Sequence, residues 1–218
     1  METKIHLSPF ENELVQNSEW ILAKRSVIEK VYHLFAGLME EYNKTLIENF
    51  PGFDFLLKRN GKISRGENYH GLPYVIMDYP AAFEKHDVFA IRTFFWWGNF
   101  FSITLHLSGK HFYALNFDKA FSFLKEKEFF ICVNKDEWNH TFEEANYIPA
   151  TQAREIQKNT ILEGRFLKIS KRVGLKEWDE AAEFLGKTFG EIMNLIRVSF
   201  RYDGAGPLPG LPREGSDL

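Results

Sequence analysis

The side chains best equipped for chemistry gather between positions 65 and 70 of the sequence. Arg65, Glu67, Asn68 and His70 occur there beside Gly66 and Gly71, and no other part of the chain is as dense in charged, amide and imidazole groups. An imidazole can act as an acid or a base near neutral pH. Polar residues also collect in ordinary solvated loops, so a structural explanation of this loop stays open.

Arg92 and Asp78 stand out because each lies within an apolar run. A guanidinium keeps its proton, and burying it without a partner is very costly. We therefore predict that Arg92 is at least half buried and paired with a carboxylate, with Asp78 the first choice and Glu67 the second. Such a pair could be structural, or it could anchor an anionic ligand if the guanidinium opened towards His70.

The stretch 87–109 is the most apolar and aromatic part of the chain, and it predicts a β-hairpin. Gly98-Asn99 lies at its centre between runs rich in aromatic and β-branched residues, and this pair can form a two-residue turn. We expect strands near 88–97 and 100–108. The polar centre argues against a membrane-spanning helix of the same length.

A two-residue turn assigns the side chains of this hairpin to two faces, because neighbours along a strand point in opposite directions. Arg92 then falls on an otherwise apolar face. The other face combines aromatic and polar side chains, namely Phe95, Trp97, Phe100, Thr104 and His106. Such a face suits the wall of a binding groove. A shift of register by one residue would exchange the faces.

The segments around the hairpin predict helices. Apolar residues recur at helical spacing over 18–49 and again over 178–200. The segment 164–173 alternates weakly, and its basic residues suggest an edge strand. This order predicts a single α+β domain over 1–203, with a mainly antiparallel sheet that is built around the aromatic hairpin and packed against a long N-terminal helix and a C-terminal amphipathic helix. The Gly/Pro-rich residues 204–218 predict a flexible tail.

Composition narrows the classes of partner. The net charge is −3 and no basic stripe occurs, so we expect no nucleic-acid binding and no membrane association. The single cysteine, Cys132, lies in an apolar run, which predicts a buried and inert thiol. The spacing of the histidines indicates no metal, and the usual nucleotide-binding and catalytic motifs are missing, so no cofactor is expected.

The apolar stripe of the long helix and the first residues of the chain bear on the partner and the location. The apolar stripe over 18–49 could form a homodimer or lie across the sheet. The first residues, METKIHLSPFENEL, lack the layout of a signal peptide, from which we expect a soluble, cytoplasmic protein.

The motif GENYHGLPYVIMDYP, followed by FAIRTFFWWGNFFSITLHLSG, resembles a family of uncharacterised bacterial conserved hypothetical proteins, a domain of unknown function. The resemblance covers about 65–109, the middle of the chain. It implies no activity and no catalytic residues.

Two functions of different class remain open. The first is a module that binds a small ligand or a protein with the aromatic sheet face, which has the 65–70 loop at its rim. The second is an enzyme of unknown class in which His70 or His106 is the acid or base, Arg92 binds an anionic group, and Asp78 or Glu67 orients them. The candidate ligand-binding residues are Arg65, Glu67, Asn68, His70, Asp78, Arg92, Trp97 and His106.

Overall fold

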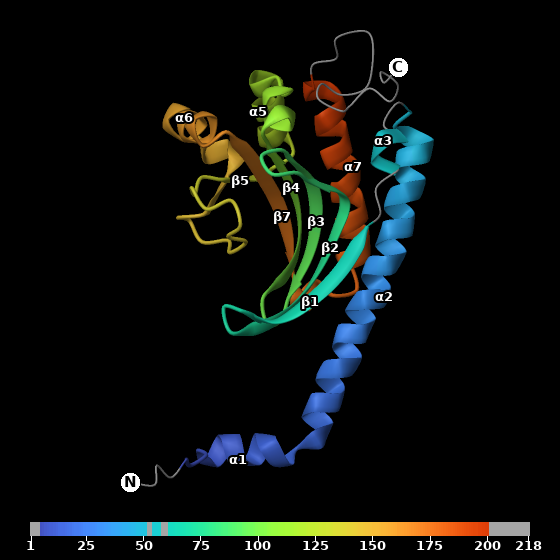
Figure 1. Cartoon of the computed structure of the whole chain (residues 1–218), viewed down its shortest axis with the longest axis vertical. Helices are drawn as coiled ribbons and strands as arrows, with labels where there is room; N and C mark the ends of the chain where they lie inside the picture. The colour runs from blue at the N-terminus through green and yellow to red at the C-terminus, as the bar shows by residue number, and fades with distance from the viewer. Residues whose placement is uncertain (1–4, 52–53, 58–60, 201–218) are drawn as a thin grey trace, which may run out of the picture.

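The computed structural model describes residues 5–51, 54–57 and 61–200 of the chain. Its centre is an antiparallel sheet of seven strands in the order β1-β2-β3-β4-β7-β5-β6 (Figure 1). The strands are β1 (Lys62–Tyr69), β2 (Leu72–Phe83), β3 (Val88–Trp96), β4 (Phe100–Ser108), β5 (Phe130–Cys132), β6 (Tyr147–Pro149) and β7 (Phe166–Gly174). The predicted α+β architecture is confirmed.

The helices are α1 (Pro9–Gln16), α2 (Ser18–Asn49), α3 (Asp54–Leu57), α4 (Lys110–Tyr113), α5 (Phe117–Glu126), α6 (Glu155–Gly164) and α7 (Ala181–Ser199). Two short 3₁₀ turns, η1 (Ala150–Gln152) and η2 (Leu175–Glu177), complete the elements. Side chains fix the first helix starts. Ser8 and Glu11 form a capping box at α1, and the Asn17 side chain accepts a hydrogen bond from the Trp20 N–H at the start of α2.

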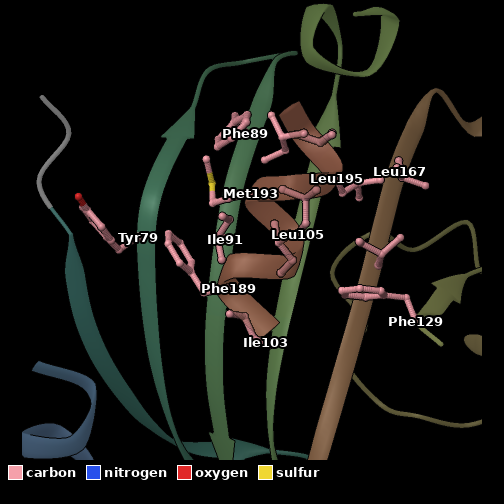
Figure 2. Packing of buried hydrophobic residues seen from close by; sticks show 14 of the residues in the cluster. Tyr79, Phe89, Ile91, Ile103, Leu105, Phe129, Leu167, Phe189, Met193 and Leu195 are labelled. Carbon is pink, nitrogen blue, oxygen red and sulfur yellow. The ribbon is translucent and has the colours of Figure 1, made fainter. Parts of the chain in front are cut away.

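The long helix α2 and the C-terminal helix α7 cover one face of the sheet, here called the helix-covered face (Figure 1). Figure 2 shows Phe189 and Met193 of α7 beside the apolar side chains of β3 and β4. The two helices also meet each other, because the ring of Tyr42 stacks on that of Phe189 at 3.9 Å. Fully burying one such side chain stabilises the fold by about 1.5–3 kcal/mol.

The aromatic hairpin forms, but its turn is one residue longer than predicted. β3 ends at Trp96 and β4 begins at Phe100, and the Asn99 N–H closes the turn on the Trp96 carbonyl at 3.0 Å. Gly98 has a positive φ of 73°, which glycine adopts without strain. Trp96 consequently pairs with Phe100, so the predicted pairing of the two strands is shifted by one residue.

This shift regroups the side chains of the two strands. Phe95 belongs to the helix-covered face, where Trp97 also packs. Arg92, Thr104 and His106 share the opposite face with Phe100. The predicted binding face, which joined Phe95 and Trp97 to Thr104 and His106, is therefore wrong.

Two further sequence interpretations change. The 65–70 loop is not a loop: residues 65–69 belong to the edge strand β1, and a turn follows at 70–71. The segment 164–173 is not an edge strand, because β7 lies between β4 and β5. The predicted tail over 204–218 lies outside the described residues. No helix in the described part of the chain has the length and apolar character needed to cross a membrane.

Candidate functional site

The face opposite the helices carries a row of polar side chains across the middle of the sheet. β2 supplies Asp78, β3 supplies Arg92, β4 supplies Thr104 and His106, and β7 supplies Lys168 and Ser170. Residues 133–146, which connect β5 to β6 and are here called the covering segment, lie over this row through the contacts described below. Lys168 is 1% exposed, so the covering segment shields a charged side chain from water.

Arg92 lies at the centre of the row and binds two partners. Its Nε donates to one oxygen of Asp78 at 2.7 Å and an Nη donates to the other at 3.0 Å, and both side chains are 16% exposed. The predicted pairing of Arg92 with Asp78 is confirmed. Its other Nη lies 2.9 Å from Nε2 of His140 in the covering segment. Asp78 and Arg92 face each other across β2 and β3, which explains the two-pronged contact.

His106 and Lys168 hold the covering segment at Glu137. The Nε2 atom of His106 lies 2.9 Å from Oε2 of Glu137. The Nζ atom of Lys168 donates to the carbonyl oxygen of Glu137 at 2.8 Å and also to that of Asn139. His106 and Lys168 are cross-strand partners on β4 and β7, so they reach the same short stretch of chain.

Burial shifts the protonation equilibria of these groups. Burial, helped by the charges of Lys168 and Arg92, lowers the pKa of His106 to about 3. Burial also lowers the pKa of Lys168 to about 8 and raises the pKa of Glu137. At neutral pH the His106 ring is therefore neutral, and its Nε2–H donates to Glu137 when that carboxylate is ionised.

The hairpin end of the same face is closed by aromatic side chains. Phe94, Trp96 and Phe100 are at most 8% exposed and form one cluster, against which Tyr69 and Phe142 pack. Rings of this cluster meet edge to face, with centroids between Tyr69 and Trp96 at 5.2 Å and between Phe100 and Phe142 at 5.1 Å. This aromatic surface is buried and offers no open wall to a ligand.

The opposite end of the face opens into a cleft of about 860 Å³. Four segments line it, at residues 83–88, 108–113, 132–138 and 160–166. Glu137 lies among the lining residues with its side chain 33% exposed, so the cleft reaches the polar row through this carboxylate. Small-molecule sites commonly measure roughly 300–1,000 Å³, a range that includes this cleft.

Gly109 shapes one edge of the cleft. A Cβ atom at this position would lie 2.0 Å from Oδ1 of Asp87 and 2.3 Å from the His86 carbonyl oxygen, and the φ angle is +56°. Asp87 needs this close approach because its Oδ1 accepts a hydrogen bond from the Lys110 N–H at 2.9 Å. Glycine thus lets the β2–β3 connection lie against the end of β4.

Two partly exposed aromatic side chains form an apolar surface in the cleft. Phe83 is 49% and Trp138 47% exposed, and their ring centroids are 6.3 Å apart. The Trp138 ring also contacts the His106 ring, with centroids 5.2 Å apart and the two planes nearly perpendicular. Trp138 therefore connects the surface of the cleft to the polar row.

Basic side chains outnumber acidic ones among the unpaired charges of the cleft. Lys85, Lys135 and Arg165 line it and make no ion pair with another described residue, whereas Glu84 is paired with Lys110 at 2.8 Å. The acidic side chains that remain are Glu137, held by His106, and Glu163. The three basic side chains that make no ion pair with another described residue can therefore contact an anionic group of a ligand.

Several residues predicted for the site lie elsewhere. Arg65 stands 5.9 Å over the ring of Tyr32, and Glu67 forms an ion pair with Lys24 of α2. Asn68 caps the following turn by accepting a hydrogen bond from the Gly71 N–H, and Trp97 packs against the helix-covered core. His70 is exposed in that turn, with its ring 4.7 Å from that of Tyr69. These contacts are structural.

Of the eight candidate residues, the structure brings together Asp78, Arg92 and His106 on one sheet face. Sequence reasoning missed Glu137, Trp138, His140 and Lys168. The signal for Lys168 was its place between the apolar residues Leu167 and Ile169 in the first half of β7. The covering segment has no periodicity, so no comparable signal existed for the others.

No protein-family model matches the chain, and neither a curated protein nor a solved structure shows significant similarity to it. The resemblance to uncharacterised bacterial proteins therefore stays a prediction. In the described part of the chain, no three His, Cys, Asp or Glu side chains are grouped so that they could hold a metal ion.

Proposed function

We propose that the protein binds a small organic anion with an apolar, planar body in the cleft at the open end of the sheet. The observation that carries this proposal is the composition of the cleft of about 860 Å³: an aromatic pair lies beside three basic side chains that make no ion pair with another described residue, and beside the carboxylates of Glu137 and Glu163. This keeps the expected class of a binding module and moves the site to the opposite end of the sheet from the buried aromatic cluster.

The aromatic pair supports the apolar part of the ligand. Phe83 and Trp138 each expose about half of their surface, and covering such rings with a planar group removes apolar surface from water. Trp138 also contacts the His106 ring, which restricts its side chain before a ligand binds and so lowers the entropy lost on binding. Glu137 then offers an acceptor to a hydroxyl or amine on the ligand.

The backbone conformation of Arg165 favours this residue as the one that binds the anionic group of the ligand. Arg165 follows α6 in a left-handed conformation with a φ of 57°, although it is not a glycine. This conformation costs roughly 1–2 kcal/mol for a residue with a side chain. Residues held at such a cost cluster at functional sites, and Arg165 is one of the residues that line the cleft.

The experiment measures binding of benzoate and phenyl phosphate by calorimetry and by the shift in Tm. Both anions should raise Tm by a few degrees at millimolar concentration, whereas neutral benzamide should not, because only the anions can use the basic side chains. Arg165→Gly should weaken anion binding at least tenfold while Tm without ligand stays equal or rises, since glycine relieves the backbone.

Glu128→Gly is the matched control, because Glu128 also has a positive φ of 56° and does not line the cleft. It should leave anion binding unchanged. Trp138→Ala should weaken the binding of benzoate and of phenyl phosphate alike, because both anions use the aromatic surface. If neither anion binds the wild-type chain, or if Arg165→Gly binds both as tightly as wild type does, the proposal is wrong.

An acid–base enzyme is the second candidate, and Glu137 is the observation that favours it. Its carboxylate has a raised pKa, is oriented by His106 and reaches the cleft, which are the properties of a general acid or base. The two candidates differ in Glu137→Gln. If the protein is an enzyme, the wild-type chain releases nitrophenolate from p-nitrophenyl phosphate or p-nitrophenyl acetate, and this change should abolish that release. If the protein is a binding module, the wild-type chain releases no nitrophenolate from either ester, and Glu137→Gln still binds benzoate.

A further inference from the structure

The N-terminal arm, here residues 5–25, projects beyond the edge of the sheet (Figure 1). It contains α1 and the first two turns of α2, joined at Asn17. None of the residues of α1 is buried, and the first buried residue of α2 is Ile28. The arm is therefore a helical extension that the body of the protein does not cover.

The arm is unusually apolar for such an extension. Large apolar side chains on it expose about half of their surface or more, namely Ile5 (92%), Leu7 (55%), Phe10 (67%), Val15 (70%), Trp20 (47%) and Leu22 (59%). A fully exposed aromatic side chain presents roughly 150–250 Å². Together these residues present several hundred Å², which approaches the roughly 800 Å² that each partner contributes to a standard protein interface.

The short helix α1 also needs a partner to stay helical. It has 8 residues. Isolated helices below about 12–15 residues are marginal in water, and packing of an apolar face normally supplies the missing stability. The capping box at Ser8 and the cap at Asn17 set the helix ends, but they cover no apolar surface. A partner surface that packs on the arm would supply the stabilising apolar contacts that the rest of the chain does not make with α1.

The charges of the arm and of the next turn of α2 are segregated along the chain. Between residues 5 and 19 the charged side chains are Glu11, Glu13 and Glu19, with no lysine or arginine, whereas Lys24, Arg25 and Lys30 follow within the next eleven residues against one glutamate. Two arms in antiparallel orientation would therefore lay the acidic part of one copy along the basic part of the other. A closed two-fold pair of this kind is self-complementary.

We propose that two copies of this chain associate through their N-terminal arms, in antiparallel orientation about a two-fold axis near Trp20. An axis near Trp20 also brings the exposed side chains of Trp20, Ile21 and Leu22 of the two copies together, because residues close to a two-fold axis meet their own equivalents. A membrane surface fits the arm less well, since α1 is acidic and helices that lie on anionic lipid are usually rich in Lys and Arg.

Sedimentation velocity of the full chain tests the proposal. Between about 1 and 100 µM the chain should pass from monomer to a species of twice its mass. Trp20→Glu combined with Leu22→Glu should weaken this dimer at least a hundredfold and leave Tm of the body nearly unchanged, because neither side chain contacts the core cluster. Ile156→Glu is the matched control, since Ile156 is 69% exposed on α6 and lies outside the arm.

Charge reversal tests the antiparallel orientation separately. Glu13→Lys with Glu19→Lys should weaken the dimer, and so should Arg25→Glu with Lys30→Glu. All four changes in one chain should restore it, because each arm then carries the opposite pattern. Lys24 is left unchanged because it pairs with Glu67.

Three results would overturn the proposal. A chain that stays monomeric up to about 100 µM has an arm that serves another partner. Sedimentation of the wild-type chain with phosphatidylserine vesicles, lost in Trp20→Glu with Leu22→Glu, would assign the arm to a lipid surface. A dimer that tolerates those two changes would be formed by a different surface.

Discussion

The Nε2 atom of His140 lies 2.9 Å from an Nη atom of Arg92. The guanidinium has only donors to offer, so Nε2 must accept this hydrogen bond, and the neutral ring carries its proton on Nδ1. Burial, together with the charges of Lys168 and Arg92, lowers the pKa of His140 well below its usual value. The covering segment is thus held to the sheet by a histidine that has to remain neutral.

Stability should therefore fall as the pH drops below about 6.5, the pKa of an unfolded histidine. The folded-state pKa values of His140 and His106 are lowered, the latter to about 3. Between these values and about pH 6.5 the unfolded chain therefore binds protons that the folded chain does not bind. Each histidine should contribute up to about 1.4 kcal/mol per pH unit to this loss. Urea unfolding at pH 7, 6 and 5 measures it.

The control for this pH dependence is His33→Gln, because His33 is exposed on α2. The free energy of unfolding of this variant should follow the wild-type pH dependence. His106→Gln should remove about half of the slope between pH 6 and 5, since one of the two histidines with a lowered pKa is gone. An unchanged slope in His106→Gln would show that this histidine does titrate in the folded protein.

Arg92→Ala should destabilise the fold by about 3–5 kcal/mol, because it leaves the Asp78 carboxylate without its partner under the covering segment. It also removes the donor that His140 accepts from. Lys44→Ala is the comparison, since the pair of Lys44 with Glu48 is largely exposed and such pairs contribute well under about 1 kcal/mol. Equal losses in the two variants, measured by chemical denaturation, would contradict the structural role of Arg92.

The Arg92–Asp78 pair shows what the sequence could predict. Both residues occur in apolar strands, and the cost of burying a lone charge leaves few alternatives to pairing. The hairpin and the two long helices were predictable for a similar reason, because strong periodicity and turn chemistry act locally. The turn at Gly98 was predicted one residue too short, and that single residue exchanged the partners on the two faces.

The contacts of the covering segment were beyond such reasoning. His140 meets a residue 48 positions away in the sequence, and Glu137 meets one 31 positions away. Neither belongs to a regular element, so no period relates them to the sheet. The position of β7 was missed because Lys168 suggested an exposed edge, whereas its charge is satisfied by two backbone carbonyls under the segment.

Cys132 should react slowly with thiol reagents although it lines the cleft. Its side chain is 1% exposed, its Sγ lies 3.4 Å from Oδ1 of Asn146, and burial raises the pKa of the thiol. Labelling by Ellman's reagent at pH 7.5 should be at least about a hundredfold slower in the folded chain than in urea, because only the thiolate reacts. Cys132→Ser with Lys125→Cys supplies an exposed thiol as the control, and equal rates for the two positions would contradict the burial.

Lys168→Met should release the covering segment while the sheet stays folded. The lysine donates to the carbonyl oxygens of Glu137 and Asn139, and methionine fills a similar volume without these bonds. Hydrogen exchange of amides 136–146 should accelerate at least tenfold, and exchange in β3 and β4 should change little. A local effect of this kind would also weaken anion binding, because Glu137 and Trp138 line the cleft.

The pH dependence of the same variant separates loss of the charge from loss of packing. The pKa of Lys168 is lowered to about 8 in the folded chain, below its unfolded value of about 10.4. Between these values the unfolded chain binds the extra proton, so wild-type stability should rise relative to Lys168→Met as the pH increases from 8 to 10. The difference between their free energies of unfolding should grow by up to about 1.4 kcal/mol per pH unit. A constant difference over this range would mean that Lys168 keeps an ordinary pKa and that solvent reaches it beneath the covering segment.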